Sequence, residues 1–196
     1  MNVGIIEYGG GNTASVLNAL RRLNVAGFVS SDAAALNQAS HLVLPGVGSA
    51  GPVMQRLKES GLSTLLQTTS KPVLGICLGM QLLFEYSEED STQGLAIIHG
   101  EVRRTPNSPK KTHVGWNIVS QIKGRLMREV EEDSEVYYVH SYSAPVVEQS
   151  TAVTIFGSSF SASVSYKNYH GVQFHPEKSG EIGSLILSNF LKSIYV

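Results

Sequence analysis

The sequence predicts an α/β fold in which a mainly parallel central sheet carries helices on both faces and continues into an antiparallel extension. Short apolar runs alternate with helical patterns in the first half of the chain, which is typical of a parallel sheet covered on both sides. The second half carries closely spaced strand-like segments, which favour antiparallel pairing. With 196 residues, 42% of them hydrophobic, and a formal net charge of −1, the chain suits a single domain over residues 1–196.

The expected elements follow from hydrophobic periodicity and from capping residues. A helix over 13–24 places Val16 and Leu20 on one face, with Asn12 or Thr13 as its cap. The other helices are expected at residues 52–60, 78–86 and 180–194. The strands are expected at residues 2–7, 26–30, 41–44, 73–76, 95–104, 112–121, 135–140, 151–156, 161–166 and 171–174.

A glycine-flanked cysteine follows the fourth predicted strand. The segment Gly75-Ile76-Cys77-Leu78-Gly79 places the chain's one cysteine where a strand gives way to helix formers. The chain folds back so sharply at such a turn that a Cβ two positions to either side would clash. A cysteine there lies beside a helix N-terminus, which favours the thiolate over the thiol. The pattern predicts a nucleophile elbow, and a small buried hydrophobe is the alternative until a base is found.

The candidate base is His175, which lies at the end of the strand predicted at 171–174. Pro176 favours extended geometry at His175, and side chains two positions apart in an extended segment share a face. Glu177 is therefore expected beside the imidazole, where a carboxylate fixes the tautomer and leaves the other nitrogen to move a proton. A surface histidine beside a solvated glutamate is the alternative. The pairing with the elbow favours a triad of Cys77, His175 and Glu177.

The loop Pro45-Gly46-Val47-Gly48 directly follows the third predicted strand. Its two glycines leave the peptide groups unshielded and permit a peptide to flip. Backbone N–H groups in such a loop can bind an oxyanion, and the amide of Leu78, the residue after the nucleophile, is the usual second donor. We therefore expect Val47, Gly48 and Leu78 to form an oxyanion hole, with a plain turn as the alternative.

Together these segments resemble the class I, triad-type glutamine amidotransferases, and the resemblance covers essentially the whole chain. It is carried by Gly75-Ile-Cys-Leu-Gly-Met-Gln81, Pro45-Gly-Val-Gly48, His140-Ser-Tyr142 and Gly171-Val-Gln-Phe-His-Pro-Glu177. More narrowly, Val114-Gly-Trp-Asn117 and Glu177-Lys-Ser-Gly180 resemble the glutaminase subunits of histidine biosynthesis. The resemblance implies a flavodoxin-like sheet and hydrolysis of glutamine to glutamate and ammonia.

The resemblance also implies how the substrate is held. Glutamine is the implied substrate, and neither a metal ion nor an organic cofactor is implied. A single cysteine independently excludes an internal disulfide and a multi-cysteine metal site. The positions that match glutamine-binding residues of the family are Gly46, Gln81, Ser141 and Tyr142.

A heterodimer partner is implied as well, namely a separate (β/α)8-barrel cyclase that consumes the ammonia. The positions that match the family's interface are Gly10, Trp116, Tyr137 and Lys178. Trp116 follows a glycine in a predicted strand, so a core position is its alternative. Gly10 lies where a phosphate loop would sit, but the spacing of a nucleotide-binding fingerprint is missing, so we expect a tight turn there.

The charge balance gives no reason to expect nucleic acid or a membrane surface as a partner. The N-terminal residues lack the pattern of a signal peptide, and no apolar run approaches a membrane span, so we expect a cytoplasmic protein. Two other functions stay open. One is an amidotransferase of another pathway, such as pyridoxal phosphate, anthranilate or guanylate synthesis, and the other is a catalytically silent regulatory module.

Overall fold

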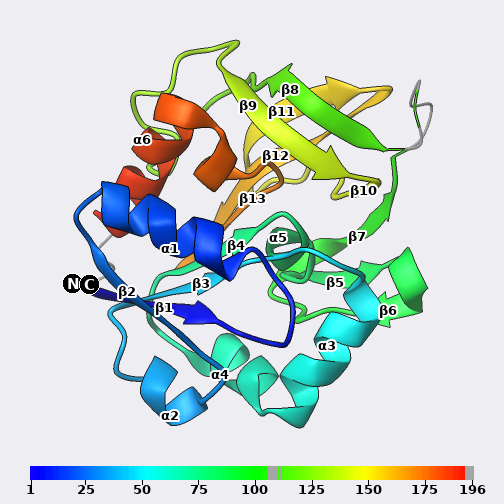
Figure 1. The fold of residues 1–196 in the computed structure, drawn as a ribbon. Helices are drawn as coiled ribbons and strands as arrows, with labels where there is room; N and C mark the ends of the chain where they lie inside the picture. Colours follow the sequence, from blue (N-terminus) through cyan, green and yellow to red (C-terminus); the bar gives the residue numbers. More distant parts are fainter. Residues whose placement is uncertain (106–109, 111, 193–196) are drawn as a thin grey trace.

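A seven-stranded central sheet forms the middle layer of the structure, a computed structural model that describes residues 1–105, 110 and 112–192 (Figure 1). The strand order is β11-β12-β13-β4-β3-β1-β2. In that order the strands are β11 (Ser150–Phe156), β12 (Ser158–Tyr166), β13 (Tyr169–Val172), β4 (Val73–Ile76), β3 (His41–Leu44), β1 (Asn2–Ile6) and β2 (Ala26–Ser30).

The strand directions confirm the predicted combination of a mainly parallel sheet and an antiparallel extension. The five strands from β13 to β2 run parallel, whereas β12 and β11 pair antiparallel with their neighbours. Helices α1 (Thr13–Arg22) and α6 (Gly180–Leu191) cover one face of the sheet (Figure 1). The other face carries α2 (Ala33–Leu36), α3 (Ala50–Glu59) and α4 (Leu62–Thr68). The fold is therefore the expected α/β sandwich with an antiparallel extension.

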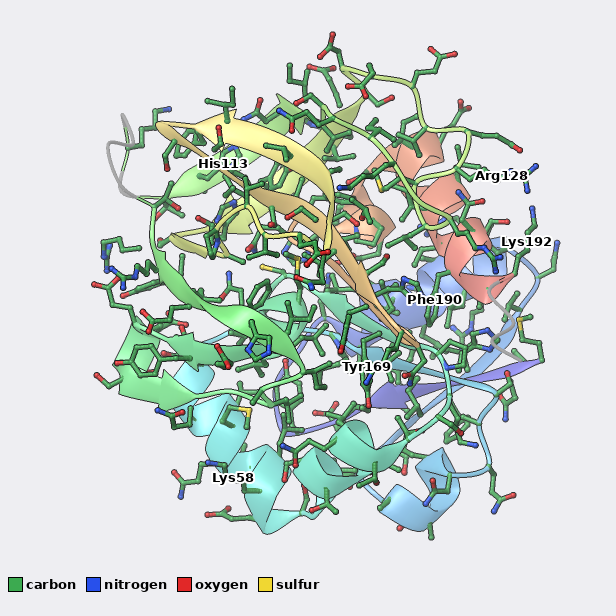
Figure 2. All side chains as sticks on the ribbon, turned by 180° about the vertical axis from the view of Figure 1, so that it is seen from behind. Lys58, His113, Arg128, Tyr169, Phe190 and Lys192 are labelled. Atoms are coloured by element: carbon green, nitrogen blue, oxygen red, sulfur yellow. The ribbon has the colours of Figure 1, made fainter. Side chains whose placement is uncertain are left out.

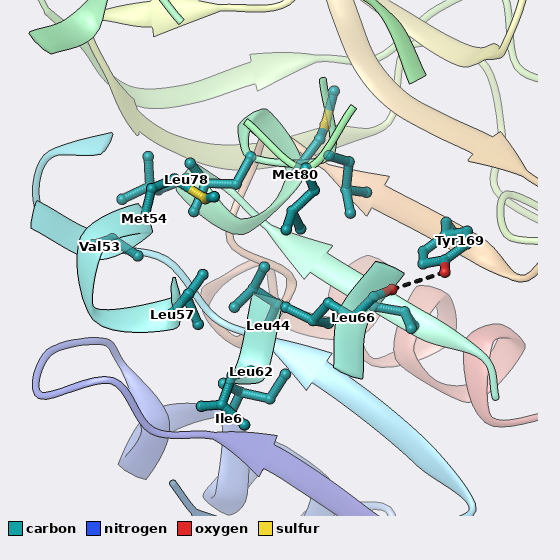
Figure 3. Packing of buried hydrophobic residues seen from close by; sticks show 14 of the residues in the cluster. Ile6, Leu44, Val53, Met54, Leu57, Leu62, Leu66, Leu78, Met80 and Tyr169 are labelled. Carbon is teal, nitrogen blue, oxygen red and sulfur yellow. Dashed lines mark hydrogen bonds between the residues drawn. The ribbon is translucent and has the colours of Figure 1, made fainter. Parts of the chain in front are cut away.

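Alternation along the buried strands divides the core into two halves, because successive side chains of a strand point to opposite faces. In β3, Val43 packs with the helices α1 and α6, whereas Leu44 packs with α3 and α4. In β1, Ile5 and Ile6 divide in the same way. Figure 3 shows the half that faces α3 and α4, where the Tyr169 hydroxyl donates a 2.8 Å hydrogen bond to the carbonyl of Leu66.

Two smaller sheets lie beside the central one. The first contains β10 (Tyr142–Ser143), β7 (Ile98–Arg104), β5 (Phe84–Ser87) and β6 (Thr92–Gln93). The second is the antiparallel pair β8 (His113–Ile118) and β9 (Glu135–His140). Because β3, β4 and β13 are parallel neighbours, their carboxyl ends meet at one edge of the sheet, where ligands bind in open α/β sheets.

The helix predicted at 78–86 is wrong. Helix α5 (Leu78–Gln81) is a single turn, and the chain then enters strand β5. The carbonyl of Leu82 accepts the Leu95 N–H at 2.8 Å, and Phe84 pairs in parallel with Ile98 of β7. These partners come from residues that follow later in the chain, so local periodicity gives no sign of them.

Other boundaries differ by a few residues. Strand β13 lies two residues before the predicted 171–174, and β7 and β8 are shorter than expected. The C-terminal end of the helix predicted at 180–194 lies outside the described residues. The elements that were not predicted are α2, α4, β5, β6, β10 and the 3-10 turns η1 (Glu89–Ser91) and η2 (Pro176–Lys178).

Several charged side chains lie at the surface of the molecule. Figure 2 shows Lys58, Arg128 and Lys192 on its outside, whereas Tyr169 and Phe190 lie within it. Within residues 1–105, 110 and 112–192, no helix has the length and apolar character needed to cross a membrane.

The glycine after the elbow gives a first test. A Cβ at Gly79 would lie 1.9 Å from the carbonyl oxygen of Leu44, and neither backbone can move without disturbing β3 or β4. We expect Gly79→Ala to lower the free energy of unfolding by ~3 kcal/mol or more, measured by urea denaturation. Gly10→Ala is the control, because its Cβ would meet nothing closer than 3.8 Å. Equal stability of the two variants would contradict the expectation.

Candidate active site

Cys77 occupies a strained turn between β4 and α5. Its backbone has φ +52° and ψ −109°, which a non-glycine residue rarely adopts. A Cβ at Gly75 would lie 2.6 Å from the carbonyl carbon and oxygen of Gly79, so the chain folds back as closely as the sequence predicts. The Cys77 N–H donates a 2.7 Å bond to the Val172 carbonyl, which ties the turn to β13. This geometry is that of a nucleophile elbow.

His175 and Glu177 meet beside the elbow. The Nδ1 atom of His175 lies 2.8 Å from Oε1 of Glu177, and both side chains are buried. Residue 175 is extended, as expected before a proline, but the 3-10 turn η2, rather than an extended segment, carries Glu177 back to the ring. The Asn12 side chain donates a 2.8 Å bond to the same Oε1 atom. Asn12 is the N-cap residue of α1, as predicted, but its side chain makes no capping hydrogen bond.

The charge environment of His175 favours the imidazolium. Burial alone would lower the pKa of this histidine. The Cys77 sulfur and the Glu177 carboxylate outweigh burial and raise the pKa to about 10. The geometry therefore supports an imidazolium beside the Cys77 sulfur, oriented by a buried carboxylate.

The loop Pro45 to Gly48 passes directly over the elbow. A Cβ at Gly46 would lie 2.3 Å from the backbone nitrogen of Gly79, so only glycine fits there. Gly48 has φ +106° and open space around it, which leaves its peptide conformation free to change. The Tyr8 hydroxyl donates a 2.8 Å bond to the Pro45 carbonyl, and burial raises the pKa of Tyr8 to about 12, so this donor persists at neutral pH.

A cavity of about 300 Å³ opens at this edge of the sheet. Every residue predicted for the triad, the oxyanion hole and glutamine binding lines it, except Glu177, which lies behind His175. The lining residues are Gly46, Val47, Gly48, Cys77, Leu78, Gln81, Glu89, Thr112, Val139, His140, Ser141, Tyr142, His175 and Lys178. Among residues 1–105, 110 and 112–192, no group of three or more His, Cys, Asp or Glu side chains is arranged to hold a metal ion.

Glu89 lines the cavity and was missed by the sequence analysis. Burial raises the pKa of its carboxyl, and the Ala50 N–H donates to it at 3.0 Å. It lies in the run Glu88-Glu89-Asp90, and no local pattern distinguishes it from its two acidic neighbours. Its position in the site results from the strand β5, which the sequence did not predict.

A second missed feature is a buried pair of histidines, of which His140 lines the cavity and His113 lies next to it. His140 Nδ1 donates to the Tyr142 carbonyl at 2.9 Å, and its Nε2 accepts from His113 Nδ1 at 3.0 Å. Burial lowers the pKa of His140 to about 3 and that of His113 to about 4, so both rings are neutral at neutral pH. The pair therefore supports the backbone at Tyr142 without adding charge to the site.

Three of the four residues predicted to face a partner lie together, and one of them, Lys178, also lines the cavity. Trp116 is 53% exposed, so the alternative of a core position is wrong. Its ring meets the Tyr137 ring edge-on at 5.9 Å between centroids, and the Lys178 Nζ atom lies 5.9 Å from the same ring. We call Trp116, Tyr137 and Lys178 the aromatic surface.

Gly10, the fourth of these residues, lies in a tight turn after β1. The N–H groups of Gly9 and Gly10 both donate to the Glu7 carboxylate, at 2.6 and 3.2 Å. A carboxylate that already occupies these amides would repel a phosphate, so the phosphate-loop alternative is wrong.

Comparison with known proteins agrees with this geometry. Residues 4–194 match the family described as glutamine amidotransferase class-I, so the chain belongs to the class-I glutamine amidotransferases. It is 44% identical over 195 residues to the imidazole glycerol phosphate synthase subunit HisH of Bacteroides fragilis, covering 98% of this chain and 100% of the relative. It is 40% identical over 196 residues to the Haemophilus influenzae subunit of the same name, covering 99% and 98%. Within its class, the chain belongs to the HisH family of imidazole glycerol phosphate synthase subunits.

Solved structures share the fold at low identity. One glutamine amidotransferase is 16% identical with a TM-score of 0.74, and the match covers 97% of each chain. The PurLQS structure from Thermotoga maritima is also 16% identical, with a TM-score of 0.72 over 97% of each chain. At such identities the likeness shows the α/β fold alone.

The pairing of His175 with Glu177 can be tested by titration. In Glu177→Gln the negative charge is lost while the side chain keeps its shape, so we expect the pKa of His175 to fall below about 10. The measurement is the NMR titration of the labelled imidazole. Glu181→Gln is the control, because Glu181 is an exposed carboxylate in the first turn of α6. An unchanged titration of His175 in Glu177→Gln would contradict the pairing.

The same pairing sets a pH window for stability. The folded-state pKa of His175 lies above its ordinary value of 6.5, so the folded state binds this proton more tightly than the unfolded state. The resulting stabilisation is complete below pH 6.5 and is lost as pH rises through about 10. Glu177→Gln should therefore reduce the decline of the unfolding free energy across this window.

Proposed function

We propose that this chain is the glutaminase subunit of an imidazole glycerol phosphate synthase in histidine biosynthesis, and that residues 1–196 act as one glutamine amidotransferase type 1 domain in the cytoplasm. It would hydrolyse glutamine to glutamate and ammonia. The observation that carries this proposal is the meeting of Cys77, His175 and Glu177 at the edge of one cavity. These groups come from segments that lie far apart along the chain. A cysteine with only a structural role would not require a histidine and a carboxylate beside it.

In the first half of the proposed reaction, the Cys77 thiolate attacks the carboxamide carbon of glutamine. A bond forms between sulfur and carbon, and the carbonyl electron pair moves onto oxygen. The amides of Val47, Gly48 and Leu78 would hold this oxyanion. His175 then gives its proton to the departing nitrogen, and the carbon–nitrogen bond breaks. Ammonia is released, and a γ-glutamyl thioester remains on Cys77.

In the second half, water replaces ammonia. His175 takes a proton from the water as its oxygen attacks the thioester carbon, and the sulfur leaves as a thiolate. Glutamate is released and the imidazolium is regenerated. Glu177, bonded to Nδ1 of His175, keeps the ring oriented through both halves.

The cavity also offers groups for the amino-acid end of glutamine. The positions that the resemblance implies for glutamine binding all line the cavity, namely Gly46, Gln81, Ser141 and Tyr142. The partly buried carboxylate of Glu89 is suited to the α-ammonium group, because opposite charges attract strongly where water is scarce. We add Glu89 to the residues proposed for substrate binding.

Ammonia released into water would be protonated and lost, so a glutaminase of this kind needs a docked partner. We propose that the partner is a (β/α)8-barrel cyclase and that it binds the aromatic surface, with Gly10 at the margin of the contact. Exposed aromatic side chains are enriched at such interfaces. The partner would bias the Pro45 to Gly48 loop toward a conformation that completes the oxyanion hole. Moving that population from about 1% to about 99% requires roughly 5.5 kcal/mol of differential binding.

The triad predicts how variants should behave in a glutaminase assay. Cys77→Ala should abolish turnover, because it deletes the nucleophile. Glu177→Gln should leave a remnant, roughly 10²- to 10⁴-fold below the parent, because orientation is lost while the nucleophile stays. Labelling of Cys77 by an electrophilic glutamine analogue, with and without the partner, completes the test. Failure under both conditions would favour a catalytically silent module.

Partner coupling is tested with the purified chain, a barrel cyclase and the cyclase's nucleotide ligand. We expect low glutaminase turnover alone and a strong rise in the complex. Trp116→Ala should weaken association by ~2 kcal/mol, measured by calorimetry. Ile155→Ala is the control, because Ile155 is 66% exposed on β11 and lies outside the aromatic surface. Full activity of the isolated chain would refute the coupling, and stable binding to the synthase of another pathway would reassign the function.

A further inference from the structure

Gln173 is a buried amide directly beside the proposed nucleophile. It lies between β13 and His175, and its side chain has no exposed surface. Its main-chain N–H is bonded to the Ala162 carbonyl at 2.8 Å. Residues 173 and 175 lie two positions apart in the segment that leaves β13, and both side chains turn toward the elbow, whereas Phe174 packs into the core.

The orientation of the Gln173 amide is fixed by its neighbours. Gln81 Nε2 donates to the Tyr142 carbonyl at 2.7 Å and to Oε1 of Gln173 at 3.0 Å. Because the Tyr142 carbonyl can only accept, the atom of Gln81 that faces it must be nitrogen. The oxygen of Gln173 therefore faces Gln81, and its nitrogen faces Cys77, with Nε2 lying 3.5 Å from Sγ.

The surroundings of the sulfur distinguish its two protonation states. A thiol can donate to the Val139 carbonyl, which lies 3.6 Å from Sγ. A thiolate cannot donate, but it is a much stronger acceptor than a thiol for the N–H of Gln173. In a site with little water, an N–H that lacks an acceptor is costly. The Gln173 amide therefore favours the anion, and the Val139 carbonyl favours the neutral thiol.

We propose that Gln173 is a further catalytic residue of this glutaminase, which holds the Cys77 sulfur as a thiolate through an Nε2–H hydrogen bond. The inference rests on the proposed function and adds a donor that the triad does not include. No proton leaves Gln173 in the reaction. Before attack, the Gln173 N–H donates a hydrogen bond to the thiolate. This hydrogen bond weakens when an electron pair of the sulfur forms the thioester bond, and it strengthens again when the thioester is hydrolysed.

The same hydrogen bonds define what Gln81 can do. Both of its amide hydrogens are used, one by the Tyr142 carbonyl and one by Gln173. Gln81 can therefore meet glutamine only through its oxygen, as an acceptor. A chain of hydrogen bonds therefore runs from Tyr142, in the proposed substrate-binding cavity, through Gln81 and Gln173 to the Cys77 sulfur.

The test measures the sulfur itself, by the rate of alkylation of the full-length chain with iodoacetamide as a function of pH. Gln173→Glu keeps the acceptor for Gln81 but replaces the donor at the sulfur with a carboxylate. We expect the alkylation rate at neutral pH to fall roughly tenfold to a hundredfold and to recover at alkaline pH. Asn168→Asp is the control, because Asn168 donates its amide to two carbonyls before β4, away from the sulfur, and should leave the profile unchanged.

An alkylation profile of Gln173→Glu that matches the parent would overturn the proposal. If this variant does not fold, Gln173→Met takes its place, because it removes the donor without adding charge, and the same profile decides. Circular dichroism on each variant separates loss of fold from loss of the donor. Alkylation requires no glutamine hydrolysis, so a parent chain that fails the glutaminase assay but shows the expected difference between variants would overturn only the proposed function.

Discussion

The site depends on the contact of two backbone turns that only glycine permits. The turn after β4 and the loop after β3 approach so closely that the carbonyl of Leu44 lies against the Cα of Gly79, and Gly46 lies against the peptide that joins Leu78 to Gly79. This contact sets the distance between Cys77 and the candidate oxyanion donors. The parallel strands β3, β4 and β13 then fix the edge at which all three segments emerge. The remaining side chains of the site are arranged around that contact.

The pKa of each buried histidine in and around the site depends on whether the ring has a charged partner. His175 is buried but keeps a raised pKa, because a carboxylate and the sulfur offset the cost of removing it from water. His113 and His140 are buried without a carboxylate partner, so their pKa values fall and both rings act as neutral hydrogen-bonding groups. The same residue type therefore serves two purposes a short distance apart. Glu177, two residues along the chain, identifies His175 in the sequence, whereas the pairing of His113 with His140 joins distant segments and leaves no local signal.

The parts of the fold and the site that could be predicted are those set by local chemistry. Glycines around Cys77 and a proline after His175 restrict the backbone within a few residues, and the structure has the backbone geometry that these restrictions imply. The α/β class followed from alternating elements in the first half. Helix 78–86 was predicted wrongly, because β5 forms only when a later strand supplies its hydrogen bonds.

The missed residues share one property, which is dependence on distant partners. Gln173 is oriented by Gln81, and Asn12 reaches Glu177 across most of the chain. Glu89 enters the cavity only because β5 folds beside β7. An amide or a carboxylate has no pattern of its own in a sequence, so its role becomes visible only when the opposite partner is known.

The order of strands also bears on how the protein is made. Strand β13 pairs with β4 but is synthesised long after it, because the strands β5 to β10 of the smaller sheets and the antiparallel strands β11 and β12 come between them. A ribosome-bound chain that has emerged only as far as the elbow carries its sulfur without imidazole, carboxylate or amide donor. The groups proposed to activate the thiol therefore join it only once translation has delivered the closing strand.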